Sequence, residues 1–256
     1  MMCIKNNSIE RFSNRVENYI KYRPHYPKEI IDILANKINL KVTDKIADIG
    51  SGTGISAINF LENGNTVIGV EPNDEMRKAS EKLLANFKKF SVIKGTSDNT
   101  NLEKNTIDLI IVGQAFHWFD YKNTKIEFQK ILKKDAYVVL IWNEKVMGIK
   151  DTFMYEYGKI LLKYGTDYEK VTYSNLSEEI IKEFFNNQFK VETLSNFQYF
   201  DFDALKGRLL SSSYVPLEGE SYNNMLLDLK TNFDKYKKEG KVNFEYETKI
   251  YYGKIS

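Results

Sequence analysis

The chain has 256 residues, 42% hydrophobic and 14% aromatic, which is typical of a globular protein with a sizeable core. Its 37 basic and 35 acidic residues leave a net charge of +2, which disfavours nucleic acid and anionic membranes as partners. A single cysteine, Cys3, excludes an internal disulfide framework, and with only two histidines we expect no metal site. The sequence has neither a signal-peptide pattern nor the roughly 18 consecutive apolar residues of a membrane span, so we expect a cytoplasmic protein.

Residues 1–40 precede the expected sheet and carry helical patterns. Residues 11–26 end in a segment with two closely spaced prolines, Pro24 and Pro27. Prolines break one helix and can begin the next. The apolar face of the second helix consists of Ile30, Ile31, Ile33, Leu34 and Ile38. We therefore expect an N-terminal helical segment over residues 1–40.

Residues 45–54 read K-I-A-D-I-G-S-G-T-G and predict a short buried strand followed by a tight glycine turn. A helical pattern follows, and then residues 66–71, T-V-I-G-V-E, predict a second strand that ends in Glu71. A strand, a glycine turn, a helix, a strand and a terminal acid form the nucleotide-binding half of a doubly wound sheet.

The spacing of the glycines indicates which nucleotide fits. Enzymes that bind a dinucleotide use G-x-G-x-x-G. This turn instead forms G-x-G-x-G, at Gly50, Gly52 and Gly54. Ile55 stands where the third dinucleotide glycine is needed, and Asp48 before the turn would repel a pyrophosphate but suits an ammonium or sulfonium group. An NAD-binding oxidoreductase is therefore disfavoured, whereas Glu71 is placed to accept hydrogen bonds from both ribose hydroxyls.

The alternation of strands and helices continues, as in a parallel α/β sheet. Further strands are predicted at residues 91–94, 107–112, 136–142, 189–202 and 242–252. The last of these alternates strictly between apolar and polar residues, which favours an antiparallel neighbour. Residues 145–188 have helical spacing and predict a helical cap inserted after the fifth strand. We expect an α/β fold, residues 1–256 forming a single domain around a doubly wound, mostly parallel seven-stranded sheet with one antiparallel strand near the C-terminus.

The run D-x-G-x-G-x-G with a glutamate at the end of the next strand resembles the class I S-adenosylmethionine-dependent methyltransferases, which have a Rossmann-like fold. A narrower resemblance rests on Y-R-P-H-Y-P (22–27), G-Q-A-F-H-W-F (113–119), R-L-L-S-S-S-Y-V-P (208–216) and Y-E-T-K-I-Y-Y-G (246–253). These motifs are similar to those of small-molecule methyltransferases that include trans-aconitate methyltransferases and related carboxyl methylases. The resemblance implies S-adenosylmethionine as the cofactor.

The resemblance also implies a cofactor site at the carboxyl ends of the strands. The expected cofactor-binding residues are Asp48, Gly50, Ser51, Gly52, Gly54, Glu71, Pro72, Met76, Ser97, Asp98 and Gln114. Glu71 would bind the ribose, Pro72 and Met76 would pack on the adenine, and the segment after the third strand would hold its edge. Many relatives carry an acid where this chain has Thr96, so this contact falls to Ser97 and Asp98. A plain core role for Met76 and a turn-capping role for Asp98 stay as alternatives.

We expect Gln114 and His117 to be the catalytic residues, because both follow the fourth strand, whose end faces the methyl donor in the fold that this sequence resembles. The expected substrate residues are Tyr22, Arg23, Tyr26, Phe116, His117, Trp118, Arg208 and Tyr214. Phe116 and Trp118 would wall the methyl-transfer site. Arg23 would bind a carboxylate, either of the methionine end of the cofactor or of the substrate, and Arg208 is a second candidate for such a contact. His117 suits proton removal, although it could equally cap the loop after the fourth strand, and methyl transfer to a carboxylate needs no base.

We expect S-adenosylmethionine-dependent methyl transfer to a small molecule, with an oxygen, for example of a carboxylate, as the acceptor. The sequence Gln114-Ala115-Phe116-His117 differs from the Asn/Asp-Pro-Pro-aromatic motif of amino-directed nucleic-acid methylases, which disfavours that reaction. Methylation of carbon or nitrogen in a metabolite such as a quinone precursor is an alternative and would demand a base. A non-catalytic S-adenosylmethionine-binding subunit is another. We expect no nucleic-acid or membrane partner, and a monomer or homodimer.

Overall fold

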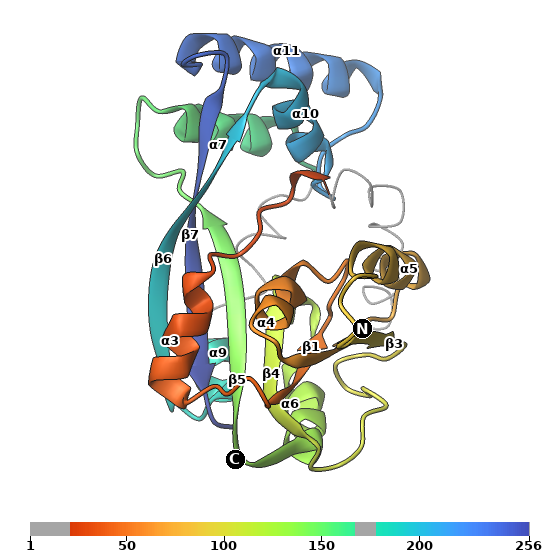
Figure 1. The fold of residues 1–256 in the computed structure, drawn as a ribbon. Helices are drawn as coiled ribbons and strands as arrows, with labels where there is room; N and C mark the ends of the chain where they lie inside the picture. Colours follow the sequence, from red (N-terminus) through yellow and green to blue (C-terminus); the bar gives the residue numbers. More distant parts are fainter. Residues whose placement is uncertain (1–20, 167–177, 256) are drawn as a thin grey trace.

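A computed structural model describes residues 21–166 and 178–255, so the part of the expected N-terminal segment before residue 21 lies outside it. Seven strands form one sheet in the order β3-β2-β1-β4-β5-β7-β6 (Figure 1). They are β1 (Lys45–Ile49), β2 (Thr66–Val70), β3 (Phe90–Ile93), β4 (Ile107–Gly113), β5 (Leu132–Lys145), β6 (Phe189–Phe200) and β7 (Val242–Gly253). β7 runs antiparallel to both β5 and β6, and the other pairs are parallel. The expected seven-stranded sheet with one antiparallel strand is confirmed.

Helices cover both faces of this sheet. They are α3 (Glu29–Ile38), α4 (Ile58–Glu62), α5 (Asp74–Leu83), α6 (Tyr121–Ile131), α7 (Phe153–Tyr164), α9 (Glu178–Phe184), α10 (Phe202–Leu210) and α11 (Gly219–Tyr236), with short 3-10 turns η1 (Ile55–Ala57) and η2 (Phe116–Trp118). None of these described helices combines the length and apolar character that crossing a bilayer requires.

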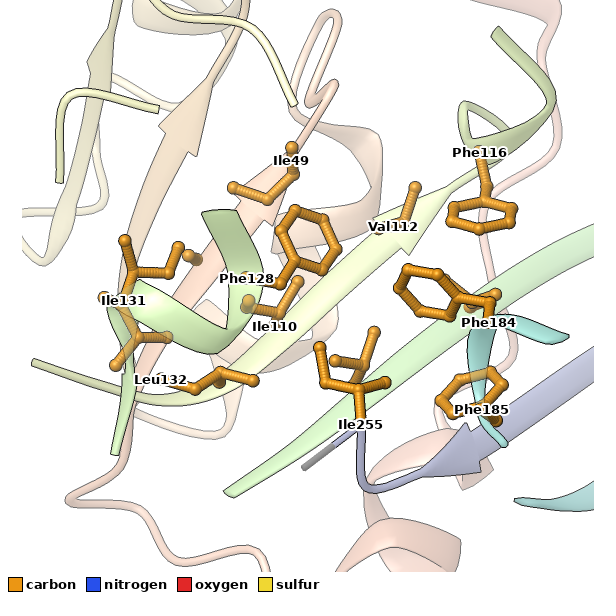
Figure 2. Close-up of a cluster of buried hydrophobic side chains, with 14 of the residues drawn as sticks. Ile49, Ile110, Val112, Phe116, Phe128, Ile131, Leu132, Phe184, Phe185 and Ile255 are labelled. Carbon is orange, nitrogen blue, oxygen red and sulfur yellow. The ribbon is translucent and has the colours of Figure 1, made fainter. Parts of the chain in front are cut away.

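Side chains of β4 alternate between two cores, which explains why this strand is a nearly continuous apolar run. Ile110 and Val112 pack with α6 and α9 on one face, as Figure 2 shows. Leu109 and Ile111 pack with α3 and α4 on the other face. The central strands are therefore buried on both sides, and only their ends are left to carry polar function.

A third core forms where β6 and β7 extend beyond the parallel strands. α7, α10 and α11, which we call the helical layer, pack there around Tyr157, Met225 and Phe244 (Figure 1, upper part). The residues expected to form a cap, 145–188, are divided in the structure. Lys145 still belongs to β5, α7 lies in the helical layer, and α9 packs with α6 on the sheet. Residues 167–177 lie outside the described part.

The strap, residues 22–27, connects the helical layer to α3 (red in Figure 1). At its start the ring of Tyr22 packs against Gly207 of α10. At its end the side-chain amide of Asn59 donates hydrogen bonds to the carbonyl oxygens of Tyr26 (3.1 Å) and Pro27 (3.0 Å). Side-chain contacts at both ends therefore fix the strap across the carboxyl end of the sheet.

Candidate active site

The glycine turn follows β1, and β1 lies between β2 and β4 where the strand order reverses. Gly50 donates a hydrogen bond to the carbonyl of Val70 (2.8 Å) and has a φ of +70°, which favours glycine. A Cβ at Gly50 would lie 2.8 Å from that of Ala115, so the loops after β1 and β4 touch. A Cβ at Gly52, in contrast, would meet no atom within 4 Å. The turn is thus packed on one side and open on the other, as a nucleotide cradle requires.

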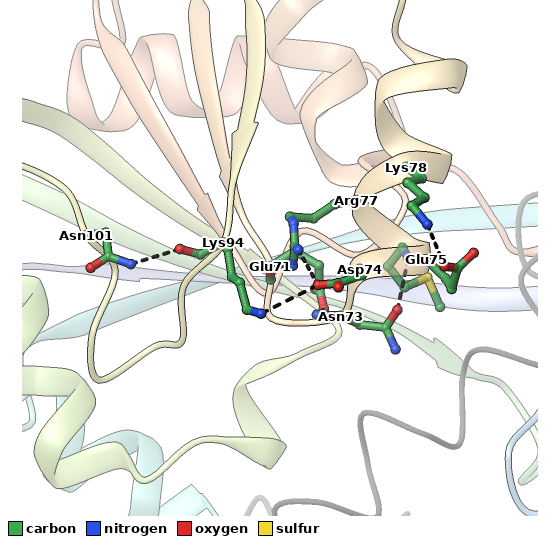
Figure 3. A network of polar contacts seen from close by, with 9 residues as sticks. Glu71, Asn73, Asp74, Glu75, Arg77, Lys78, Lys94 and Asn101 are labelled. Carbon is green, nitrogen blue, oxygen red and sulfur yellow. Dashed lines mark hydrogen bonds and ion pairs between the residues drawn. The ribbon is translucent and has the colours of Figure 1, made fainter.

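The carboxylate of Glu71 lies over this turn. It accepts hydrogen bonds from the backbone N–H groups of Gly52 and Asn73, both at 2.9 Å, and its side chain is buried. Burial raises the pKa of Glu71, and the two N–H donors act against this rise. Arg77 donates to the Glu71 carbonyl at 2.7 Å and belongs to the polar network in Figure 3. Glu71 is held where an acid can accept hydrogen bonds from ribose hydroxyls.

Asp48 lies beneath the turn and is fully buried. Ser56 donates a hydrogen bond to its Oδ2 at 2.6 Å. Burial, with a smaller contribution from the charge of Glu71, raises the pKa of Asp48 to about 7, although the Ser56 bond opposes the change. Among the described atoms, Asp48 Oδ1, Ser51 Oγ and Thr53 Oγ1 are buried without a hydrogen-bond partner. Unsatisfied polar atoms are costly, and this set fits the ammonium group and other polar atoms of S-adenosylmethionine.

The residues expected near the adenine follow β2 and β3 at the same edge of the sheet. Pro72 is half-buried, and Met76 is buried in the first turn of α5, which Asn73 caps by accepting a hydrogen bond from the Met76 N–H. Ser97 accepts a hydrogen bond from Thr124 Oγ1 at 2.8 Å. Asp98 accepts one from Thr96 at 2.7 Å. These four residues, like Glu71, follow β2 or β3 at the carboxyl end of the sheet. None of them lines the cavity described next.

A cavity of about 450 Å³ extends from the glycine turn towards the helical layer. Segments far apart in sequence form its wall, namely the strap, the turn, the ends of β4 and β5, and the end of α10. The expected residues that it brings together are Arg23, Tyr26, Gly50, Ser51, Gly52, Gln114, His117, Trp118, Arg208 and Tyr214. Tyr22 is not part of this wall, because its ring packs on Gly207.

Gln114 follows β4 with a φ of +57°, which is uncommon for a residue with a side chain and is often found at functional sites. Its N–H donates to the carbonyl of Ile141 at 2.9 Å. Its Nε2 donates to the carbonyl of Asn143 at 3.1 Å. Since Nε2 is engaged in this way, Oε1 is the atom with which the amide can accept a hydrogen bond from a ligand.

The short turn η2 sends its side chains in different directions. His117 and Trp118 line the cavity, and burial, followed by the positive charge of Arg23, lowers the pKa of His117 to about 4. Phe116 differs from the expectation that it walls the site. It is buried in the core, with its ring centre 4.7 Å from that of Phe184 (Figure 2). A 3-10 turn directs successive side chains about 120° apart, so Phe116 points inward when its neighbours face the cavity.

Positive side chains gather at the far end of the cavity. Arg208 is 2% exposed, donates to Tyr246 Oη (2.9 Å) and Ser211 Oγ (3.3 Å), and has no acidic partner among the described residues. Lys145 Nζ lies 3.2 Å from Tyr214 Oη, and burial lowers the pKa of Lys145. Burial would raise the pKa of Tyr214, but Lys145 and Arg208 outweigh it and lower this pKa to about 8.

Sequence reasoning missed Lys145. It expected Asn143, together with Trp142, at the carboxyl ends of the strands but gave Asn143 no role. Lys145 and Asn143 both line the cavity from the end of β5, which continues to Lys145 rather than stopping at Trp142. The polar run N-E-K directly after an apolar strand is the signal that could have indicated Lys145.

Comparisons with known proteins agree with this geometry. Residues 47–140 match the family described as "Methyltransferase domain". An uncharacterised methyltransferase of Mycobacterium tuberculosis (strain ATCC 25618 / H37Rv) is 30% identical over 145 residues, which cover 57% of each chain, so the alignment spans little more than half of that relative.

Two solved structures share the fold. A protein named as a type II methyltransferase from Anaeromyxobacter dehalogenans has a TM-score of 0.67 at 17% identity, with 91% of this chain and 98% of that chain covered. A phosphoethanolamine N-methyltransferase from Haemonchus contortus, solved in complex with S-adenosylhomocysteine, has a TM-score of 0.57 at 13% identity, with 95% and 58% covered. The matched residues 47–140 include the glycine turn, Glu71 and the end of β4. Residues 47–140 of this chain are therefore similar to a methyltransferase domain, and the solved structures agree with its fold.

Proposed function

We propose that this protein transfers the methyl group of S-adenosylmethionine to a carboxylate oxygen of a small organic acid, with S-adenosylhomocysteine as the other product. The assignment of a carboxylate as the acceptor rests on Arg208. This buried cation lies at the wall of the cavity and has no acidic partner among the described residues. The Arg208 side chain donates hydrogen bonds to hydroxyl groups and lies over the ring of Phe244 (5.4 Å), but these partners are neutral. A buried charge without a counter-charge is costly, and such charges are concentrated at functional sites. A bound anion would offset this cost.

Two neighbouring cations support the same assignment. Arg23 and Lys145 line the cavity with Arg208, and Arg23 also donates to the carbonyl of Ser211 at 3.0 Å. Glu144, the acid on the cavity wall, forms an ion pair with Lys249 at 2.6 Å. The cavity thus favours an anionic acceptor over a neutral or cationic one.

The state of His117 supports an acceptor that needs no base. With a pKa of about 4, its imidazole is neutral at pH 7 and a weak proton acceptor. A carboxylate is already ionised at neutral pH, so alignment with the sulfonium methyl and exclusion of water would supply most of the rate. Methylation of carbon or nitrogen, which would demand a base, has less support from this site, and Gln114 would act by orienting a reactant.

The test is a set of methylation reactions with labelled S-adenosylmethionine and separate mono-, di- and tricarboxylic acids. Methyl esters release labelled methanol in mild alkali, whereas methyl ethers, amines and carbon-methylated products do not. We expect alkali-labile label with at least one acid. Exclusively alkali-stable products would overturn the carboxylate assignment, and S-adenosylhomocysteine binding without turnover on any metabolite pool would favour a non-catalytic subunit.

Variants connect this reaction to Arg208. Arg208→Gln should raise the KM for the acid at least tenfold, since a charge-assisted hydrogen bond contributes roughly 1.5–3 kcal/mol. Arg208→Lys keeps the charge and should lie between this variant and the wild type, which covers the case in which the glutamine protein folds poorly. Lys122→Gln, which removes an exposed cation of α6, is the matched control and should behave as wild type.

A further inference from the structure

Asn143 lies next to the cavity at the end of β5, and its side chain is buried. Its Oδ1 accepts hydrogen bonds from Thr248 Oγ1 (2.5 Å) and from Asn196 Nδ2 (3.0 Å). Thr248 belongs to β7, which pairs with β5, and Asn196 belongs to β6, the next strand beyond β7. Because both donors approach Oδ1, the amide has a single satisfactory orientation, and Nδ2 faces the strap.

The strap receives this amide at the carbonyl of His25. Asn143 Nδ2 donates to it at 3.4 Å, and Asn196 Nδ2 donates to it at 2.8 Å. His25 lies between Arg23 and Tyr26, which both line the cavity. The two asparagines therefore set the height of the strap above the glycine turn.

The backbone of Asn143 reaches the other side of the site. Its carbonyl accepts the Nε2 hydrogen bond of Gln114 at 3.1 Å, which fixes the orientation of the Gln114 amide. Asn143 thus contacts both the strap and the strained residue at the end of β4.

We infer that Asn143 is a positioning residue for methyl transfer, which holds the strap and the Gln114 amide in register around the bound reactants. The inference rests on the proposed function only in that this cavity is the site of methyl transfer. It also explains why an asparagine follows the apolar segment of β5. Aspartate at this position would keep the two acceptor bonds but could not donate to His25.

The experiment compares Asn143→Asp with Asn243→Asp, an exposed asparagine of β7 that serves as the matched control. Hydrogen exchange of a peptide covering residues 21–28 is measured with and without S-adenosylhomocysteine. Binding of S-adenosylhomocysteine is followed by tryptophan fluorescence, because both tryptophans, Trp118 and Trp142, line the cavity. Thermal unfolding reports global stability in parallel.

We expect Asn143→Asp to speed exchange of this peptide at least tenfold and to weaken S-adenosylhomocysteine binding about fivefold, with Asn243→Asp unchanged. Thr248→Val, which removes only the donor that orients the amide, should give a smaller effect of the same kind and covers the case in which the aspartate protein does not fold. Hydrogen exchange as slow as in the wild type, in both Asn143→Asp and Thr248→Val, would overturn the inference. So would a loss of binding that merely follows a loss of global stability. Failure of the wild type to bind S-adenosylhomocysteine would count against the proposed function, while exchange in the ligand-free protein would still test Asn143.

Discussion

Ser56 donates a 2.6 Å hydrogen bond to Asp48, a carboxyl group that is fully buried beneath the glycine turn. This burial raises the pKa of Asp48 to about 7, whereas the unfolded chain ionises the same group near pH 4. Between about pH 4 and pH 7 the folded protein therefore binds a proton that the unfolded chain releases. The free energy of unfolding falls across this window as pH rises, and the loss is complete above pH 7.

Asp48→Asn removes this titration and keeps an oxygen to accept the Ser56 hydrogen bond. We expect the ligand-free variant to be more stable than wild type at pH 8 by a few kcal/mol, on the order of the shift in pKa, and nearly equal to it at pH 4. Urea denaturation at several pH values measures the difference. A constant difference between pH 4 and pH 8 would contradict the raised pKa.

The affinity for S-adenosylhomocysteine should also depend on the ionisation of Asp48. Its ammonium group favours the ionised carboxylate, so its Kd should rise as pH falls below 7, by up to about tenfold per pH unit. Asp48→Asn should bind more weakly and should lose this pH dependence. Calorimetry from pH 5.5 to 8.5 measures both effects, and an equally steep dependence in the variant would point to another group.

Glu71 should contribute much of the nucleoside affinity. Glu71→Ala removes the acceptor for ribose hydroxyls and leaves the N–H groups of Gly52 and Asn73 without their partner. Hydrogen bonds to a charged group contribute about 1.5–3 kcal/mol, so we expect the Kd for S-adenosylhomocysteine to rise roughly 10- to 100-fold. Glu75→Gln, an exposed change in α5, is the control. Equal affinity in wild type and Glu71→Ala would remove Glu71 from the site.

The backbone conformation of Gln114 should lower the stability of the folded protein. Its φ of +57° suits glycine better than a residue with a side chain. We expect Gln114→Gly to be about 1 kcal/mol more stable than Gln114→Ala, because both lose the side-chain hydrogen bond but only alanine keeps the backbone strain. Both should methylate poorly. Chemical denaturation of the two variants gives the comparison, and equal stabilities would show that the backbone is unstrained.

His117 should be neutral throughout the working pH range. The chain has two histidines, so a His25→Asn protein contains a single imidazole whose resonances belong to His117. An NMR titration should place its pKa near 4, as burial and the charge of Arg23 require. His117→Asn should then keep turnover within about tenfold of wild type, since neutral hydrogen bonds contribute about 1 kcal/mol. A pKa near 7 together with abolished turnover would restore the role of His117 as a base.

Gly207 should be needed for the start of the strap to dock. A Cβ at this position would lie 2.0 Å from the ring of Tyr22. We expect Gly207→Ala to cost about 1–3 kcal/mol from overpacking, and Gly207→Ala combined with Tyr22→Ala to recover part of that loss. Gly148→Ala, where an added Cβ would meet no atom within 4 Å, is the control. Thermal unfolding of these variants tests the contact.

The sequence predicted a strand correctly where a single hydrophobic pattern determines it. The apolar run of β4 and the strict alternation of β7 predicted strands that the structure confirms, since burial on both faces or on one face leaves a distinct pattern. The positions of the glycine turn after β1 and of Glu71 after β2 could be predicted equally well, because the spacing of the residues determines both.

Contacts between distant segments could not be predicted in the same way. The direction of Phe116 depends on a 3-10 turn that no periodicity specifies. The amide of Asn143 becomes significant only when β6, β7 and the strap are assembled around it. Lys145 was missed because β5 continues past its apolar segment in order to pair with β7.

The continuous pairing of β5, β7 and β6 has a consequence for how the protein admits its acceptor. One hydrogen-bonded ladder runs from the half of the molecule that carries the glycine turn to the half that carries the helical layer, with Phe189–Phe200 paired along the whole of Val242–Gly253. A hinge between the two halves would have to break this ladder, so we expect the acceptor to enter without a hinge motion between them.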